Sequence, residues 1–400
     1  MKKESESHAA KEKIIRKPAV STVIVLAIAA AVLLFTVFSI YSGDALKGDT
    51  SIFSVYGGEQ VEFEKASVTE ILSESMEADD AADGAYEGSQ ELSVVVGSGR
   101  YKGEEMVVYN YFGPLSGVPV SKGDSVIITI KTHTDGEHSA TVYEFNRIPV
   151  LIAFLLLFSA IIIVIGGRKG LRSLIGLAFT VICLFMVLIP LLLRGAPVVL
   201  TTFLVCAYIA LVCFTILGGV CRKTVSAFLG TVCGTFLAMA FGLAVQFFAK
   251  IDGLRLEDAE PLLQLKYTGA EIGLRGLLVA GIIISALGAV MDVSMSISSS
   301  LEEVHAADPS LTRRDLFRSG MNIGRDMAGT MTNTLILAFL GSEFALIIFL
   351  YSRGLTFYHL FSTAFIALET ISGLSSSIGM ILTIPLTALI SSVLITKKRQ

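Results

Sequence analysis

Residues 148–165 read Ile-Pro-Val-Leu-Ile-Ala-Phe-Leu-Leu-Leu-Phe-Ser-Ala-Ile-Ile-Ile-Val-Ile, an apolar run without one charged side chain. A helix needs about 20 mainly apolar residues to cross a bilayer, and its backbone groups must hydrogen-bond within the helix while they lie in lipid. Further runs of this kind occur along the 400 residues, so the sequence predicts about eight transmembrane helices. Their approximate bounds are 20–41, 148–165, 174–193, 197–217, 225–248, 274–293, 330–350 and 371–395.

The composition excludes a soluble globular protein, because 53% of the residues are hydrophobic and only 16% are charged. The formal net charge of −4 conceals an uneven distribution. Residues 42–147 carry 7 Lys and Arg against 19 Asp and Glu, a net charge of −12. We therefore predict four parts: a basic tail at 1–18, a transmembrane helix at 19–41, an extracytoplasmic domain at 42–147 and a seven-helix membrane domain at 148–400.

Basic residues next to the predicted spans indicate the orientation, since Lys and Arg resist translocation across the membrane. They gather at every second loop, which predicts that both termini are cytoplasmic and that residues 42–147 lie outside. The first span is longer than the apolar core of most signal peptides, so we expect a retained signal anchor in a multi-pass protein of the plasma or inner membrane. The clusters are Lys2–Lys17, Arg168–Arg172, Arg222–Lys223, Arg313–Arg325 and Lys397–Arg399.

The exported segment reads as a small all-β domain, with short Val-, Ile-, Tyr- and Phe-rich stretches separated by turn residues. We expect strands at 52–63, 66–72, 92–96, 105–112, 125–131 and 140–145, forming a barrel or sandwich. The acidic stretch Glu70–Glu91 is interpreted as a solvated, mobile loop. His133 and His138 lack a third ligand and are interpreted as surface residues. All five cysteines fall in or beside predicted spans, which favours a packing role.

Two predicted cytoplasmic turns begin alike. Gly166-Gly167-Arg168-Lys169 follows the second span, and Gly218-Gly219-Val220-Cys221-Arg222-Lys223 follows the fourth. Aligned on their Arg-Lys pairs, spans two–three and four–five become parallel copies, a recurrent construction in transporters. The alternative is that any cytoplasmic turn tends to collect Gly, Lys and Arg. Gly230, Gly234, Ala238 and Gly242 recur every four residues on the fifth span and predict a face for close helix packing.

Polar residues inside the predicted spans are functional candidates, because burying charge in a bilayer is costly. Asp292 lies at the inner end of the sixth span and Asp326 just before the seventh, so the two aspartates are expected in the same leaflet. Asn333 should lie about 10 Å deeper than Asp326 at 1.5 Å per residue. With Thr332 and Ser376 in the middle and Glu369 at the outer face, these residues outline a polar route across three helices.

A simpler reading competes with this route. Asp326 could pair with Arg325 or Arg318 at the membrane surface, Asp292 could simply end a span, and Ser and Thr often bond their own helix. The stretch Ser298–Arg318 is interpreted as a long, charged, amphipathic linker with a turn at Pro309.

Three blocks resemble the YibE/F-like family of bacterial membrane proteins: 288–293 (Gly-Ala-Val-Met-Asp-Val), 316–327 (Leu-Phe-Arg-Ser-Gly-Met-Asn-Ile-Gly-Arg-Asp-Met) and 329–338 (Gly-Thr-Met-Thr-Asn-Thr-Leu-Ile-Leu-Ala). Lys102-Gly103-Glu104 before Gly123-Asp124-Ser125-Val126 is also similar to the exported domain of that family. The resemblance covers the chain from about residue 90 onward. It implies a polytopic membrane protein and supports Asp292, Asn322, Arg325, Asp326, Thr332 and Asn333 as the site, but it supplies no substrate.

The leading prediction is a secondary transporter or permease component for a small solute or ion. Asp292 and Asp326 would bind a proton or cation, and Asn322 and Asn333 would orient the substrate or ion. Arg325 would tune the carboxylate or bind an anionic group. The alternative is a non-transporting scaffold whose exported β-domain binds an envelope protein. Because the chain lacks zincin, nucleophile-elbow and Walker motifs, we predict no enzyme activity, cofactor or metal. The expected partners are the lipid bilayer and a small solute or ion, and no nucleic acid.

Overall fold

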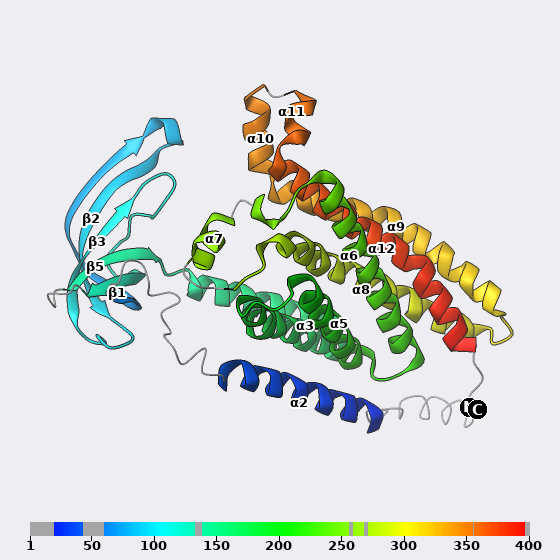
Figure 1. The fold of residues 1–400 in the computed structure, drawn as a ribbon. Helices are drawn as coiled ribbons and strands as arrows, with labels where there is room; N and C mark the ends of the chain where they lie inside the picture. Colours follow the sequence, from blue (N-terminus) through cyan, green and yellow to red (C-terminus); the bar gives the residue numbers. More distant parts are fainter. Residues whose placement is uncertain are drawn as a thin grey trace, which may run out of the picture. The chain divides into compact units, whose positions relative to one another are not determined.

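The computed structural model describes residues 20–42, 60–132, 138–255, 259–267, 271–354 and 356–396. The chain divides into two compact units, one within Ser42–Val164 and the other within Met1–Tyr41 and Ile165–Gln400. The first contains the strands, drawn in blue and cyan in Figure 1, and the second contains most of the helices.

The β unit is a closed five-stranded barrel. Its strands run in the order β1-β2-β3-β5-β4, and β1 pairs with both β2 and β4 to close the sheet. This order, with β3 and β5 parallel, is that of the OB-fold, a Greek-key barrel. Leu92, Val108 and Ile128 are among the fully buried side chains that fill its interior. The strands are β1 (Gln60–Asp79), β2 (Ala85–Val96), β3 (Glu105–Phe112), β4 (Ser125–Thr132) and β5 (His138–Phe145).

The last four predicted strands are confirmed, but the prediction of a mobile loop at Glu70–Glu91 is wrong. This stretch forms a long antiparallel hairpin in which β1 continues to Asp79 and β2 begins at Ala85. Glu77 stands opposite Glu87, and Asp80–Ala82 forms a single 3-10 turn at the tip. Hydrogen bonds between the strands hold these polar residues in place without an apolar pattern. Residues 52–59 and His133 lie outside the described residues, and His138 begins β5.

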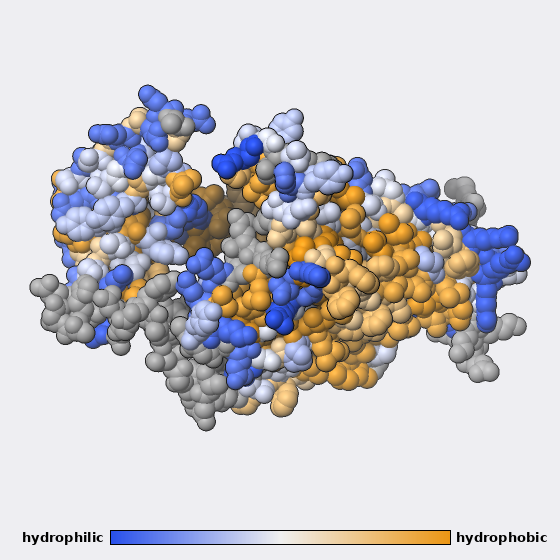
Figure 2. Space-filling model, turned by 45° about the horizontal axis from the view of Figure 1, so that its top comes forward, coloured by the Kyte–Doolittle hydropathy of each residue, from blue (hydrophilic) through white to orange (hydrophobic). Residues whose placement is uncertain are grey.

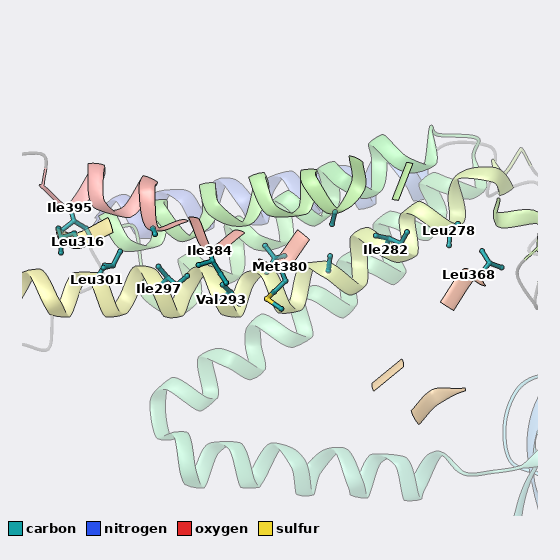
Figure 3. Close-up of a cluster of buried hydrophobic side chains, with 14 of the residues drawn as sticks. Leu278, Ile282, Val293, Ile297, Leu301, Leu316, Leu368, Met380, Ile384 and Ile395 are labelled. Carbon is teal, nitrogen blue, oxygen red and sulfur yellow. The ribbon is translucent and has the colours of Figure 1, made fainter. Parts of the chain in front are cut away.

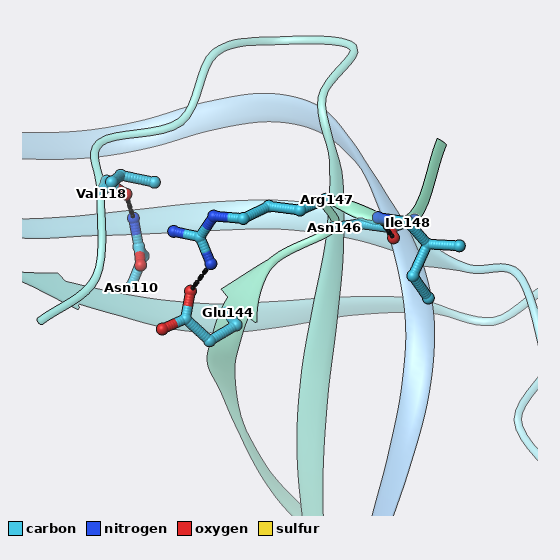
Figure 4. A network of polar contacts seen from close by, with 6 residues as sticks. All are labelled: Asn110, Val118, Glu144, Asn146, Arg147 and Ile148. Atoms are coloured by element: carbon cyan, nitrogen blue, oxygen red, sulfur yellow. Dashed lines mark hydrogen bonds and ion pairs between the residues drawn. The ribbon is translucent and has the colours of Figure 1, made fainter. Parts of the chain in front are cut away.

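A buried polar cluster ties a connecting loop to the barrel. The Gln90 side chain donates to Glu74 and to the Val120 carbonyl, and its oxygen accepts from Asn110 and from the Val120 N–H. Asn110 also donates to the Val118 carbonyl at 3.0 Å, as Figure 4 shows. The same view shows Arg147 paired with Glu144 at 2.6 Å and the Ile148 N–H donating to Asn146 at the end of the barrel.

Six described helices are long and apolar enough to cross a membrane, or up to seven if the bent pair α9–α10 forms one span. The count of eight therefore stays a prediction. The helices are α2 (Val20–Ser42), α3 (Ile148–Cys183), α4 (Ile189–Leu193), α5 (Val198–Gly218), α6 (Arg222–Ala249), α7 (Ala259–Tyr267), α8 (Leu277–Ala307), α9 (Arg313–Ser342), α10 (Phe344–Ser352), α11 (Phe357–Ser362) and α12 (Ala364–Thr396), with a π-helical turn at Leu184–Leu188.

The expected turn between the second and third spans is a kink. Helix conformation continues from Ile148 to Leu193 except at Gly167, where φ is 54° and ψ is −131°. The corresponding Gly219 of the second predicted turn has φ of 70°. Glycine tolerates positive φ at little cost, so each Gly-Gly pair bends the chain at its second glycine.

Helices α6, α8, α9 and α12 pack together around the main apolar core (Figure 1). Figure 3 shows this core as a line of side chains: Leu301, Leu316 and Ile395 at one end, Val293 and Ile384 in the middle, and Leu278 and Leu368 at the other. Elsewhere, apolar side chains cover much of the surface of the helical unit (Figure 2).

The predicted linker Ser298–Arg318 is helix over most of its length. Helix α8 continues to Ala307 because Ser298 and Leu301 are buried in the bundle, and α9 already begins at Arg313. Thr312 starts α9 with a capping box in which its side chain accepts from the Asp315 N–H and Asp315 accepts from the Thr312 N–H.

Helix α2 packs on the helical unit. The Tyr208 hydroxyl donates to the Ala29 carbonyl at 2.6 Å, and the Val220 N–H donates to the Thr22 hydroxyl at 3.0 Å. The second contact lies next to the bend at Gly219, so α2 is joined to both the middle and the end of α5.

Candidate functional site

Hydroxyl pairs join α8 to α12 along the bundle. In each pair the residue of α12 follows the residue of α8 by 91 to 93 positions. Because this separation stays nearly constant along the bundle, the two helices run parallel. Such bonds hold helices together where no water is present. Ser376, predicted in the polar route, is thus fully buried and engaged in helix packing. The pairs are Ser285–Ser376 (2.7 Å), Ser294–Thr387 (3.3 Å) and Ser298–Ser391 (3.0 Å).

The glycines of α6 pack against the hydroxyl pairs that join α8 to α12. Gly230 faces Thr387 and Gly234 faces Thr383, each so closely that a Cβ atom would overlap the threonine hydroxyl. Gly242 meets Ile282 of α8. The predicted packing face of the fifth span is therefore confirmed. The contacted residues of α8 and α12 fall in number as those of α6 rise, so α6 runs antiparallel to both helices.

Asp292 and Asp326 lie at the same level of the bundle, as the sequence predicts. Ser294, two residues from Asp292, bonds Thr387, and Gly324, two residues from Asp326, contacts Ile384. This level is the middle of the apolar stretch of α12, whereas the sequence predicts that the two aspartates lie at the end of a span. Both aspartate side chains are exposed, and no hydrogen bond or ion pair within the described residues joins any two of the eight predicted site residues.

Helix α9 turns its glycines inward and its polar residues outward. Gly320 contacts Ala388 and Gly324 contacts Ile384, so the backbone of α9 lies close to α12. The predicted site residues Asn322, Arg325, Asp326 and Asn333 are exposed on the opposite face. Thr332 lies between the two faces, and its hydroxyl is buried without a hydrogen-bond partner.

A cavity of about 310 Å³ opens where α9 ends. The axes of α9 and α10 differ by 63°, and Glu343 occupies the break between them. Glu343, between α9 and α10, and the predicted Glu369, on α12, are its two charged lining residues in an otherwise mostly apolar wall. The other lining residues are Ile336, Phe339, Leu340, Ile347, Phe361, Ile366, Thr370, Gly373 and Leu374.

Glu343 was missed because it was treated as part of the apolar run 330–350. A signal was available, since a single carboxylate within such a run is costly and is a functional candidate by default. Its neighbours Gly341 and Ser342 are weak helix formers, which agrees with the break that the structure shows.

Basic residues predicted to be cytoplasmic gather at the opposite end of the bundle. Lys223 pairs with Glu302 of α8 at 3.2 Å. The Arg222 guanidinium donates to the Ile395 carbonyl at 3.1 Å, and Arg313 donates to the Thr396 hydroxyl at 3.0 Å. These contacts join the ends of α6, α8, α9 and α12, so the cavity with its two glutamates and the basic cluster mark opposite ends of one bundle.

No cluster of three or more His, Cys, Asp or Glu side chains suited to a metal ion occurs among the residues placed in the structure. Among known protein families, the family model described as YibE/F-like protein matches residues 154–397 of the chain. That range includes Asp292, Asp326, Glu343 and Glu369, whereas the barrel lies outside it. No curated protein and no solved structure matches the chain significantly.

Proposed function

The chain belongs to the YibE/F-like family, and from this premise we propose that it is a membrane transport protein, a secondary transporter or permease component for a small solute or ion. It would act in the cell membrane without catalysing a reaction. The proposal rests on one observation above all: two carboxylates, Glu343 and Glu369, line the same apolar cavity at a helix break.

Such a site suits a proton or a small cation. Ionised carboxylates are poorly solvated against apolar walls, and two of them in one cavity repel each other. Shared protonation or a bound cation relieves both costs. Broken helices place free backbone carbonyls beside such groups, as in known transporters, and the bend after Ser342 supplies this element here.

The polar residues of α8 and α9 that lie nearer the basic end of the bundle would also take part in transport. Asp292 and Asp326 would receive the proton or cation at mid-bundle, Asn322 and Asn333 would orient the cargo, and Arg325 would set the charge around Asp326. The common level of the two aspartates supports this assignment.

For the topology, we propose eight spans with the residues before α2 and after α12 in the cytoplasm and the barrel outside. A straight helix from Ile148 to Leu193 would be about 70 Å long, more than twice the hydrocarbon core of about 30 Å. Division at Gly167 makes two spans of ordinary length. The gathering of Arg222, Lys223 and Arg313 at one end of the bundle supports a cytoplasmic position for that end.

Reconstitution tests the proposal. Purified protein in liposomes loaded with a pH-sensitive dye is given a proton or cation gradient in the presence of a panel of small solutes. We expect flux from the unchanged protein and its loss in Glu343→Gln and Glu369→Gln. Glu303→Gln, which removes an exposed acid at the basic end of α8, is the matched control and should retain flux. Unchanged flux in the two cavity variants, or no flux from the unchanged protein, would refute the proposal.

A second candidate function has one observation in its favour. The outer face of the barrel exposes Tyr109 and Tyr111, whose rings stack at 6.5 Å, and Tyr143, whose ring meets Phe63 at 5.0 Å. Exposed aromatic patches rimmed by polar groups often bind partners. A scaffold that binds an envelope protein would lose its cellular effect in a Tyr109→Ala, Tyr111→Ala double variant and keep it in Asp292→Asn with Asp326→Asn. The reverse result would exclude the scaffold role.

A further inference from the structure

Helix α9 carries an outward row of polar residues that no other part of the described chain covers. This α9 polar face consists of Asn322, Arg325, Asp326, Gly329, Thr330 and Asn333, all exposed. Neither Arg325 nor Asp326 has an ion pair or a side-chain hydrogen bond within the described residues. A Cβ atom added to Gly329 would meet nothing within 4 Å, so the backbone itself is open to an approaching surface.

The contacts of the opposite face of α9 place this row at bilayer depth. Gly324 lies against Ile384, which is roughly 16 Å along α12 from Ile395 at 1.5 Å per residue. Ile395 is close to the end of the apolar helix α12, so we place it at one edge of the hydrocarbon core. Because that core is about 30 Å thick, Arg325 and Asp326 then lie near its middle. Charged side chains at that depth face protein or water, not lipid. The α9 polar face must therefore meet either water or a second protein surface in the membrane, and its own residue pattern favours a protein surface.

The row is complementary to itself. Asn322, Asp326, Gly329 and Asn333 follow steps of four, three and four residues, the spacing of a seam between two parallel helices. Around a two-fold axis along the membrane normal, each residue of the seam meets its own copy at the same depth. Arg325 precedes Asp326 by one position and flanks the seam, so Arg325 of each copy reaches Asp326 of the other. Asparagines at such positions pair across the axis, and Gly329 permits close approach.

We infer that a second copy of this chain covers the α9 polar face, forming a two-fold symmetric dimer through α9 with reciprocal Arg325–Asp326 ion pairs. The inference does not depend on transport, since a dimer would form whether or not the cavity at Glu343 carries an ion. It adds a second chain to the surroundings of the polar residues of α9: Asn322, Asp326 and Asn333 line an interface between two chains, and any cation or cargo that they hold lies at that interface.

Crosslinking between two differently tagged full-length copies in native membranes tests the dimer. Gly329→Cys should give an oxidant-dependent crosslink that is recovered with one tag and detected with the other. The matched control is Leu204→Cys, an exposed position on α5. The unchanged chain, with its five natural cysteines, sets the background.

Charge reversal then tests the pairing. In the Gly329→Cys background, Arg325→Asp or Asp326→Arg alone puts like charges together and should lower the crosslinked fraction about tenfold. The combined reversal restores opposite charges and should recover most of the crosslink. Equal crosslinking of Gly329→Cys and Leu204→Cys in correctly inserted protein would overturn the inference. So would crosslinking of Gly329→Cys only to a different protein, or a double reversal no better than the single changes.

Discussion

Replacement of Gly234 by valine tests the close packing of α6 against α12. The added Cβ atom would overlap the Thr383 hydroxyl and would lie 2.8 Å from Val290 Cγ1. Thr383 cannot turn away freely, because its hydroxyl donates to the Gly379 carbonyl at 2.7 Å. Overpacking of this kind costs about 1–3 kcal/mol, and the better helix propensity of valine recovers only a few tenths. We expect a net loss of about 2 kcal/mol in the free energy of unfolding.

The assay is thermal unfolding of the purified protein in detergent, followed by loss of the monodisperse species. For a helical unit of this size, 1 kcal/mol corresponds to about 2–4 °C, so Gly234→Val should lower Tm by roughly 4–8 °C. Gly281→Val is the control, since Gly281 lies on α8 with nothing within 4 Å of its Cβ position. An unchanged Tm for Gly234→Val, or an equal fall for Gly281→Val, would refute the packing argument.

Three further changes probe other parts of the chain. Gln90→Ala removes four hydrogen bonds at a buried position of the barrel and should destabilise it by about 2–3 kcal/mol, measured by denaturant unfolding followed by tyrosine fluorescence. Ser376→Ala removes the 2.7 Å contact with Ser285 and should cost about 0.6 kcal/mol, which a double-mutant cycle with Ser285→Ala would isolate as the coupling between the two residues. Hydrogen bonds from the side chain and backbone of Ser310 hold the pKa of Asp308 below its ordinary value. Its stabilisation is therefore present above pH ~4 and lost as the pH falls through the lowered pKa. Asp308→Asn should lower Tm at neutral pH, and the difference should vanish in acid.

Hydropathy alone predicted the bounds of the helices that are flanked by polar turns. The run 225–248 corresponds to α6 at Arg222–Ala249, and 197–217 corresponds to α5 at Val198–Gly218. These helices begin and end where the apolar character of the chain ends, because the boundary residues are glycine, proline or basic. Periodicity also predicted the buried face of α6, since small residues at four-residue steps can serve only one side of a helix.

The barrel hairpin shows where composition misleads. Glu74, Glu77 and Glu87 make this segment resemble a disordered loop, yet β1 and β2 pair continuously from Ser73 to Asp79. A two-stranded ribbon satisfies its backbone groups whatever its side chains are, and the adjoining barrel supplies the apolar contacts that start the pairing. The sequence contains no local signal for the ribbon because the stabilising contacts lie at the base of the hairpin.

The residues of the candidate site stay a prediction, but two of them lie at a different position along the bundle from the expected one, for a reason that applies to α8 and α9 together. Hydropathy ended one span at Val293 and began the next at Thr330, which left Asp292 and Asp326 at an edge. Helices end where hydrogen bonding and packing end, however, and burial of Ser298 and Leu301 carries α8 far beyond its last apolar run. A polar residue near the end of an apolar run can thus lie at mid-bundle. The same reasoning applies in reverse to Glu343, which is central in its apolar run but lies at the end of its helix. Contacts between helices, rather than runs along one of them, decide which carboxylates share a level.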